Sequence, residues 1–315
     1  LVFFKASMLR YNCSGPRQIN GVISISGAKN AALPMLAATL MADQPITLKK
    51  VPQLDDVRNM LKIMSAFGAK LAANDQDEMI IATPEITSDV VDHDLMSLIR
   101  ASVLVIGPLL ARHRSVKIST PGGCAIGERP IDMHLKALEQ MGATITQKQG
   151  CIHLSAQDGL VGTDVVFDQV TVTGTENILM AATLARGTTQ IFNAAREPEV
   201  VNLAELLIKM GAHIEGIGTD TIRIHGVASL HGAYHEVIPD RIEAGTYLIA
   251  AAMTQGHVVL EEVQPKHLTA VIEKLKKVGA DITQTDNSIT LLMKSRPKAV
   301  DIKTCAYPGF PTDLQ

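Results

Sequence analysis

The residues best suited to chemistry lie in the loop formed by residues 121–130, whose sequence is PGGCAIGERP. Cys124 follows Pro-Gly-Gly, and consecutive glycines indicate an open loop rather than a packed core. Arg129 lies five residues further on, and a nearby cation favours the thiolate form of a cysteine. Such a thiol can act as a nucleophile or as a proton donor near neutral pH. The alternative interpretation is a small hydrophobic loop residue.

Further polar residues lie at the entrances of apolar segments that are long enough to form helices. They are Lys29 and Asn30 before residues 31–41, Arg100 before residues 101–111, Thr173, Gly174 and Thr175 before residues 178–185, and Arg241 and Glu243 before residues 244–253, with Asp313 near the end of the chain. Because a helix N-terminus presents free N–H groups and partial positive charge, these positions suit phosphate and carboxylate groups. Together with the cations Lys29, Arg100 and Arg129, they predict a ligand with several negative charges.

Each of these residues has a simpler interpretation when it is considered alone. Asn30 would be a helix cap, and Lys29 would be a solvated surface side chain. Arg241 and Glu243 would form a structural ion pair with each other. Only their shared position at successive helix entrances favours a binding function.

The elements that must position these residues form a repeat. A Gly-Ala dipeptide follows a helix-length segment at residues 68–69, 142–143, 211–212 and 279–280, at intervals of 74, 69 and 68 residues. Each unit is predicted to be βαβαββ, with one apolar helix and one amphipathic helix. In the first unit we expect strands at residues 21–26, 46–48, 70–73 and 79–82 and helices at residues 31–41 and 54–67. Because one unit is too small to bury its own faces, the copies must pack together.

The two ends of the chain carry separate expectations. Residues 302–315 resemble the opening strand and turn of a fifth unit, but the helix that should follow is absent from the sequence. This pattern predicts a chain truncated within the repeat, with poor packing after about Ile238. The first Met is Met8, so residues 1–7 are expected to be upstream, non-native sequence.

Length and composition predict a globular protein of two domains, because 315 residues exceed what one core usually serves. The net charge of −3 and the absence of Trp argue against a nucleic-acid surface. No uncharged apolar run reaches the ~18 residues that a membrane span needs. The cysteines form no C-x-x-C pair and no metal-spaced cluster with His, so Cys13, Cys151 and Cys305 are expected to be inert thiols.

Five segments together resemble the UDP-N-acetylglucosamine 1-carboxyvinyltransferases, a family of enolpyruvyl transferases. They are SGAKN at residues 26–30, the Cys124 loop with RPID at residues 129–132, NAAREPE at residues 193–199, PDRIE at residues 239–243 and PGFPTD at residues 308–313. The resemblance runs from about Met8 to Gln315 in family order. The sister family that makes enolpyruvylshikimate phosphate lacks the Gly-Gly-Cys loop and the Arg-Pro-Ile-Asp turn. The RNA 3′-phosphate cyclases share a related architecture, but their nucleotide-handling motif is absent here.

The resemblance implies an α/β fold in which repeated βαβαββ units form two inside-out α/β barrels, with the helices in the middle. Residues 21–237 would form the complete three-unit barrel that carries the Cys124 loop. Residues 8–20 and 238–315 would form the second, incomplete barrel, to which the N-terminal strand crosses over. Substrates would bind in the cleft between the two domains.

The resemblance also implies a reaction, in which the enolpyruvyl group of phosphoenolpyruvate moves to the 3′-hydroxyl of UDP-N-acetylglucosamine with release of phosphate. This is the first committed step of bacterial peptidoglycan synthesis. The only partners that the resemblance implies are the two small-molecule substrates. It implies no cofactor, metal, nucleic acid or membrane, and the protein is expected to be a cytoplasmic monomer. The alternative is a catalytically inactive fragment that binds the nucleotide sugar, because the later units are missing.

Site residues follow from the same resemblance. Lys29 and Asn30 would hold phosphoenolpyruvate, and Arg129 would add charge at its phosphate. Cys124 would donate the proton to the methylene carbon and would be the residue that the epoxide fosfomycin captures. The remaining substrate-binding residues would be Arg100, Asp132 and Met133, which position the nucleotide sugar, and Asp313, which binds its 3′-hydroxyl and is the candidate base.

Overall fold

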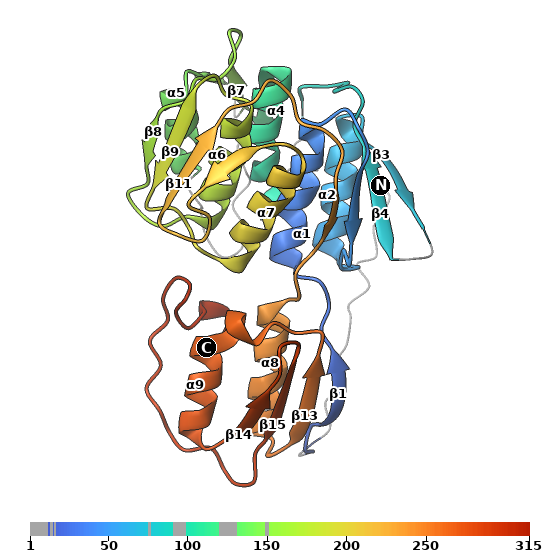
Figure 1. Ribbon diagram of the computed structural model, residues 1–315, viewed down its shortest axis with the longest axis vertical. Coiled ribbons are helices and arrows are strands. Elements are labelled where there is room, and N and C mark those ends of the chain that lie inside the picture. The colour runs from blue at the N-terminus through green and yellow to red at the C-terminus, as the bar shows by residue number, and fades with distance from the viewer. Residues whose placement is uncertain are drawn as a thin grey trace, which may run out of the picture.

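The computed structural model describes residues 17–74, 77–90, 99–119, 131–148 and 151–315, together with Asn12 and Gly15. The side chains of Arg100, Ser119 and Lys148 lie outside this description. The described chain forms two domains, each with its own cluster of buried apolar side chains (Figure 1). The larger cluster runs from Ala28 to Val237, and the smaller one joins Ile25 to residues 244–314.

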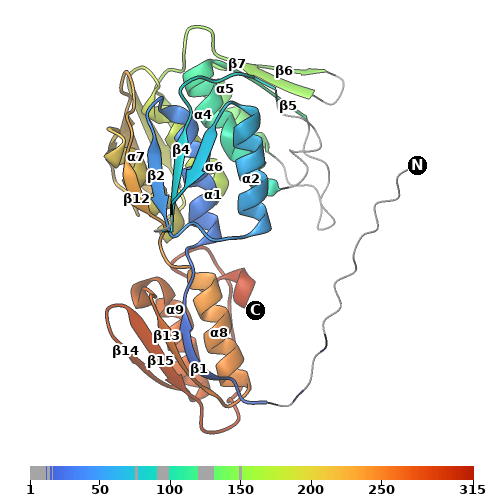
Figure 2. The same ribbon diagram turned by 90° about the vertical axis from the view of Figure 1, so that its right-hand side faces the viewer.

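Three small sheets form the outside of the larger domain (Figures 1 and 2). The first has the order β12 (Tyr234–Glu236), β2 (Ile46–Lys49), β4 (Glu78–Ala82) and β3 (Lys70–Ala73). The second has the order β5 (Ser115–Ser119), β7 (Cys151–Ser155) and β6 (Thr144–Lys148). The third has the order β10 (His213–Glu215), β11 (Thr221–His225), β9 (Thr188–Phe192) and β8 (Asp164–Val166). Each sheet contains the strands of one repeat, except that β12, from a later part of the chain, joins the edge of the first sheet.

Apolar helices occupy the middle of this domain. They are α1 (Lys29–Ala38), which continues as the 3₁₀ turn η1 (Thr39–Met41), α4 (Ile106–His113), which follows the 3₁₀ segment η2 (Arg100–Val105), and α6 (Val172–Thr183). Residues 31–38 of α1 and 174–183 of α6 are all buried, as helices without a polar face should be. Protein surrounds these helices, and no helix in the described ranges has the length and apolar character that crossing a bilayer requires.

Amphipathic helices complete each repeat and bury one face only. They are α2 (Asp55–Ala66), α5 (Asp132–Gln140) and α7 (Pro198–Lys209). In α2 the buried residues are Val57, Met60, Ile63 and Met64, which follow the helical spacing of the sequence. The positions of both helix types therefore confirm the α/β fold of repeated units that the sequence predicts.

The smaller domain consists of one sheet covered by α8 (Arg241–Met253) and α9 (Thr269–Val278), with the short 3₁₀ turn η3 (Pro265–Leu268) before α9. The sheet has the order β1 (Asn20–Ser24), β13 (His257–Glu261), β15 (Ser288–Leu292) and β14 (Asp281–Gln284). Val258 and Leu260 of β13, Ile289 and Leu291 of β15, and Leu248 of α8 are all fully buried. The expectation of poor packing after Ile238 is therefore wrong for this sheet and its core. The helix α8 nevertheless leaves Met253 72% exposed, although its composition resembles that of α1, whose residues 31–38 are all buried.

The two domains exchange their first strands. β1, which precedes α1 in the sequence, pairs in parallel with β13 of the smaller domain. β12, which precedes α8, pairs in parallel with β2 of the larger domain. The pairing of β1 agrees with the crossover of the N-terminal strand that the family resemblance implies. The expected bounds are wrong, because the crossing strand is Asn20–Ser24 and residues 21–26 were expected in the larger domain. An edge strand can pair with any sheet whose edge is open. Residues 1–11, including the expected upstream segment, lie outside the described residues.

Candidate active site between the two domains

A cavity of about 360 Å³ lies where the two domains meet. The larger domain contributes the first turns of α1 and α6, part of η2, and Glu197 and Glu199 at the start of α7. The smaller domain contributes Arg241 and residues 305–313, which lead into the 3₁₀ turn η4 (Thr312–Leu314). The beginnings of α1, α6 and α8 therefore face one space, as the shared position of their polar residues in the sequence predicts, and the start of α7 faces it as well.

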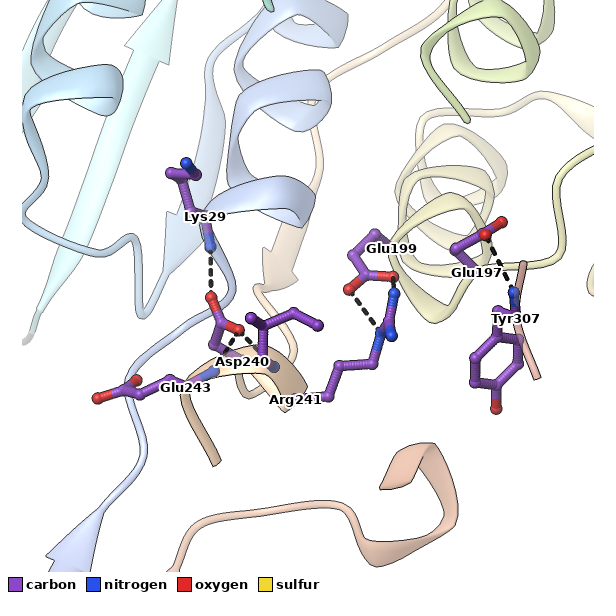
Figure 3. A network of polar contacts seen from close by, with 8 residues as sticks. Lys29, Glu197, Glu199, Asp240, Arg241, Glu243 and Tyr307 are labelled. Carbon is purple, nitrogen blue, oxygen red and sulfur yellow. Dashed lines mark hydrogen bonds and ion pairs between the residues drawn. The ribbon is translucent and has the colours of Figure 1, made fainter. Parts of the chain in front are cut away.

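Asp240 joins the helix starts on the two sides of the cavity (Figure 3). Its Oδ1 accepts hydrogen bonds from the backbone N–H groups of Ile242 and Glu243, at 2.8 and 3.0 Å, and so caps α8. Its Oδ2 accepts from the backbone N–H of Lys29 at 3.3 Å, at the start of α1. One carboxylate thus satisfies free donors of both domains where the chain crosses between them.

Arg241 forms a buried ion pair with Glu199 across the domain boundary, at 2.9 Å for Nε–Oε1 and 3.3 Å for Nη2–Oε2 (Figure 3). The guanidinium also lies 5.5 Å from the ring centre of Tyr307. Burial raises the pKa of Glu199, and the charge of Arg241 opposes that rise. The expected pairing of Arg241 with Glu243 is wrong, because Glu243 accepts hydrogen bonds from the backbone N–H and the hydroxyl of Ser26 instead.

Two further glutamates face the same cavity. Glu197 Oε1 accepts a hydrogen bond from the backbone N–H of Tyr307 at 3.3 Å, while its Oε2 is buried without a partner in the described part of the chain. Glu176, in α6, is 2% exposed, and its Oε1 also lacks a partner there. Burial, together with the charges of Glu199 and Glu197, raises the pKa of Glu176 well above its usual value.

We refer to Glu176, Glu197 and Glu199 as the carboxyl wall of the cavity. Sequence reasoning assigned no role to any of them. Glu197 and Glu199 belong to the NAAREPE segment, which was used only to support the family resemblance. The signal that could have revealed Glu176 is a charged residue within the first turns of a helix that is otherwise buried on all sides.

Two of the site residues expected from the sequence line the cavity, namely Asn30 and Asp313, and both are solvent-exposed. Lys29 is not among the lining residues, since its ammonium forms an ion pair with Asp56 Oδ2 at 3.0 Å. Figure 3 shows its side chain directed away from Asp240, toward the larger domain.

The other expected residues stand apart from the cavity or outside the described chain. Asp132 is exposed and Met133 half-buried in the first turn of α5, and neither lines the cavity. Arg100 begins η2, whose Ala101 and Leu104 do line it. Cys124 and Arg129 lie outside the described residues. The roles assigned to all eight residues therefore stay predictions.

The remaining cysteines and the possible metal ligands among the described residues do not indicate a further site. Cys151 and Cys305 are free and exposed, and Cys305 lines the cavity. Cys13 lies outside the described residues. Within the ranges that the structure covers, no group of three or more His, Cys, Asp or Glu side chains is arranged to hold a metal ion.

Comparison with known proteins places the chain in a family. The family model described as EPSP synthase (3-phosphoshikimate 1-carboxyvinyltransferase) matches residues 13–315. Two curated relatives, from Acinetobacter guillouiae and Acinetobacter baylyi, are named UDP-N-acetylglucosamine 1-carboxyvinyltransferase and are 50% and 49% identical over 310 residues. The match covers 98% of this chain and 74% of each relative. The chain belongs to the enolpyruvyl transferase family. The resemblance inferred from its motifs is thus confirmed.

Solved structures of enolpyruvyl transferases share the fold. The enzyme NikO from Streptomyces tendae aligns with a TM-score of 0.83 at 20% identity, over 95% of this chain and 72% of that protein. An EPSP synthase from Acinetobacter baumannii aligns with a TM-score of 0.70 at 22% identity, over 91% of this chain and 67% of that protein. At such identities the likeness concerns the fold alone.

A buried polar network supports the α6 side of the cavity in this enolpyruvyl transferase. Asn177 Oδ1 accepts a hydrogen bond from the backbone N–H of Gly107 at 2.6 Å, and a Cβ at residue 107 would lie 2.4 Å from Asn177. The amide nitrogen of Asn177 lies 3.0 Å from His134 Nδ1, which must accept because an amide nitrogen only donates. The proton of the neutral ring is then on Nε2, 3.4 Å from the hydroxyl of Thr173, which lines the cavity.

His134 should make this enolpyruvyl transferase sensitive to acid. Burial lowers its pKa to about 4 from 6.5. Between these values the unfolded chain binds the proton and the folded chain does not, so stability is lost as the pH falls from 6.5 toward 4. We expect protonation of His134 to make the free energy of unfolding about 2 kcal/mol lower at pH 5 than at pH 7.5.

Urea unfolding at pH 7.5 and pH 5, for the wild type and His134→Gln, measures this effect. The variant should be less stable than the wild type at pH 7.5. The difference between their free energies of unfolding should be about 2 kcal/mol smaller at pH 5. The exposed His213 provides the control variant His213→Gln, which should leave the wild-type dependence intact. An equal difference in the free energy of unfolding at both pH values would exclude His134 as the source of the acid sensitivity.

Proposed function

We propose that this protein transfers the enolpyruvyl group of phosphoenolpyruvate to the 3′-hydroxyl of UDP-N-acetylglucosamine and releases phosphate, the first committed step of bacterial peptidoglycan synthesis. The observation that carries the proposal is 50% identity to a UDP-N-acetylglucosamine 1-carboxyvinyltransferase over 98% of the chain. The position of Asn30 and Asp313 on one interdomain cavity supports it.

The addition step of the reaction needs two proton transfers, and the elimination that follows needs a third. As the sugar oxygen bonds to the enol carbon, one group must take the hydroxyl proton and another must protonate the methylene carbon. Loss of a proton from the resulting methyl group and departure of phosphate then restore the double bond. Asp313 is the candidate base, because its carboxylate belongs to the cavity lining. Cys124 is the candidate acid, and Lys29, Arg100 and Arg129 are the candidates for holding negative charge.

Both substrates are small molecules, and the two domains of one chain supply the cavity. A monomer is therefore sufficient for the proposed activity. The substrates are metabolites of the cytoplasm, which is accordingly the proposed location of the protein.

Phosphate release from phosphoenolpyruvate, measured with and without UDP-N-acetylglucosamine, tests the proposal. We expect release only when the nucleotide sugar is present, and none when shikimate 3-phosphate replaces it. Release with shikimate 3-phosphate would assign the chain to the sister activity. Binding of the nucleotide sugar without release would instead support a binding module and contradict the proposed transfer.

The proposed role of Cys124 predicts a covalent adduct with fosfomycin. A cysteine thiolate opens an epoxide by nucleophilic attack, so intact-mass and peptide mass spectrometry should find one adduct, on Cys124. Cys305 is the competing thiol, since it is exposed and lines the cavity. Cys124→Ser should abolish the adduct and Cys305→Ser should not. Modification of Cys305 in the wild type would refute the assignment of Cys124.

A further inference from the structure

The cavity has an uneven distribution of charge among its described lining residues. The carboxyl wall places Glu176, Glu197 and Glu199 on the side of α6 and α7. Arg241 is the only described lysine or arginine that lines the same cavity, and Glu199 already holds its guanidinium through two hydrogen bonds. Among the described lining residues, this side of the cavity therefore has no cation free to hold a phosphate group.

Glu176 differs from the two other members of the wall. Glu199 is paired with Arg241, and Glu197 accepts one backbone hydrogen bond. Glu176 is almost completely buried, and within the described chain its carboxyl has no protein partner for Oε1. A buried polar group without a partner destabilises the folded protein, so packing does not explain a carboxyl group at this position.

The surroundings of Glu176 favour its uncharged form. Two other carboxyls share the site, and like charges at short range cannot all remain ionised at little cost. A neutral carboxylic acid offers one O–H donor and one carbonyl acceptor. Sugar hydroxyl and acetamido groups are likewise donors and acceptors without charge, whereas a phosphate would add negative charge to the wall.

We propose that Glu176, whose buried carboxyl lines the cavity with Oε1 unpartnered, is a substrate-binding residue that forms hydrogen bonds with the sugar part of the nucleotide sugar. The carboxyl wall then contacts the uncharged sugar ring, beside Asn30 and Asp313 of the same cavity. This inference rests on the proposed function, because it takes UDP-N-acetylglucosamine as the ligand.

Equilibrium binding of UDP-N-acetylglucosamine and of UDP, measured by calorimetry for the wild type, Glu176→Gln and Glu176→Leu, tests the inference. Glutamine keeps a hydrogen-bond donor and an acceptor without charge. The affinity of Glu176→Gln for the nucleotide sugar should therefore stay within about threefold of the wild-type value. Leucine removes both, and the affinity should fall about tenfold or more. The affinity for UDP, which lacks the sugar, should change less than about twofold in either variant.

Thermal unfolding separates this role from a structural one. Because leucine replaces a buried group that lacks a partner, the midpoint of Glu176→Leu should be equal to or above that of the wild type. Glu176→Met serves the same purpose should the leucine variant not fold. The exposed Glu139 of α5 provides the control variant Glu139→Leu, which should bind both ligands as the wild type does.

Several outcomes would overturn the inference. Unchanged affinity of Glu176→Leu for the nucleotide sugar would show that residue 176 makes no contact with it. An equal loss of affinity for UDP in Glu176→Leu would indicate general distortion of the site. A loss of affinity for the nucleotide sugar in Glu176→Gln as large as in Glu176→Leu would mean that binding requires a charged carboxylate. If the expected pattern appears without phosphate release, the proposed transfer fails while the inference stands. If the wild type does not bind the nucleotide sugar, both fail.

Discussion

Asp313→Asn is expected to lower kcat for phosphate release by about 10²- to 10⁴-fold, the usual contribution of a positioned general base. Asp313 lies in η4 on the wall of the interdomain cavity, with its side chain exposed to solvent. Asparagine has nearly the same shape and still forms hydrogen bonds, but it cannot accept the hydroxyl proton. The KM for UDP-N-acetylglucosamine should therefore change much less than kcat.

Initial rates of phosphate release at saturating concentrations of both substrates measure this prediction. Asp301→Asn is the matched control, because Asp301 is also exposed and precedes the same terminal segment without lining the cavity. It should leave kcat unchanged. A kcat of Asp313→Asn within threefold of the wild type would remove Asp313 from the list of candidate bases.

Arg241→Met is expected to reduce the free energy of unfolding by about 3–5 kcal/mol, because it leaves Glu199 buried without its cation. The side chains of Arg241 and Glu199 are only 12% and 3% exposed. Methionine fills much of the space of the arginine stem but supplies no charge. Without Arg241 the pKa of Glu199 should rise further, so the loss should be smaller at acidic pH, where the carboxyl becomes protonated.

Urea unfolding of the wild type, Arg241→Met and the double variant Arg241→Met/Glu199→Leu measures the effect. The double variant should recover most of the loss, since a well-packed apolar pair can replace a buried ion pair. Lys294→Met breaks the exposed pair of Lys294 with Asp281, whose side chains are 71% and 63% exposed, and should cost no more than about 1 kcal/mol. A loss in Arg241→Met as small as in Lys294→Met would contradict the buried-charge explanation.

The spacing of the Gly-Ala dipeptides was sufficient to locate the repeat of this protein, and hydrophobic periodicity was sufficient to locate most of its helices. The apolar residues 31–38 form a helix buried on every side, and the spacing of Val57, Met60 and Met64 forms the buried face of α2. These features depend on interactions between residues close in the chain, so the sequence alone determines them. The motifs also identified the family, because they combine residue type and order across the whole chain.

Only the tertiary structure decided which distant elements meet. The residue pattern of β1 and β12 does not say which sheet either strand joins, and the crossover of the N-terminal strand was expected only from the family resemblance. Arg241 similarly had Glu243 on its own helix as a candidate partner, but Glu199 of the other domain binds it. Ion pairs and strand edges take partners according to position in space, and the separation along the chain carries little information about that position. The carboxyl wall, assembled from two helices and a preceding loop, became visible for the same reason only in three dimensions.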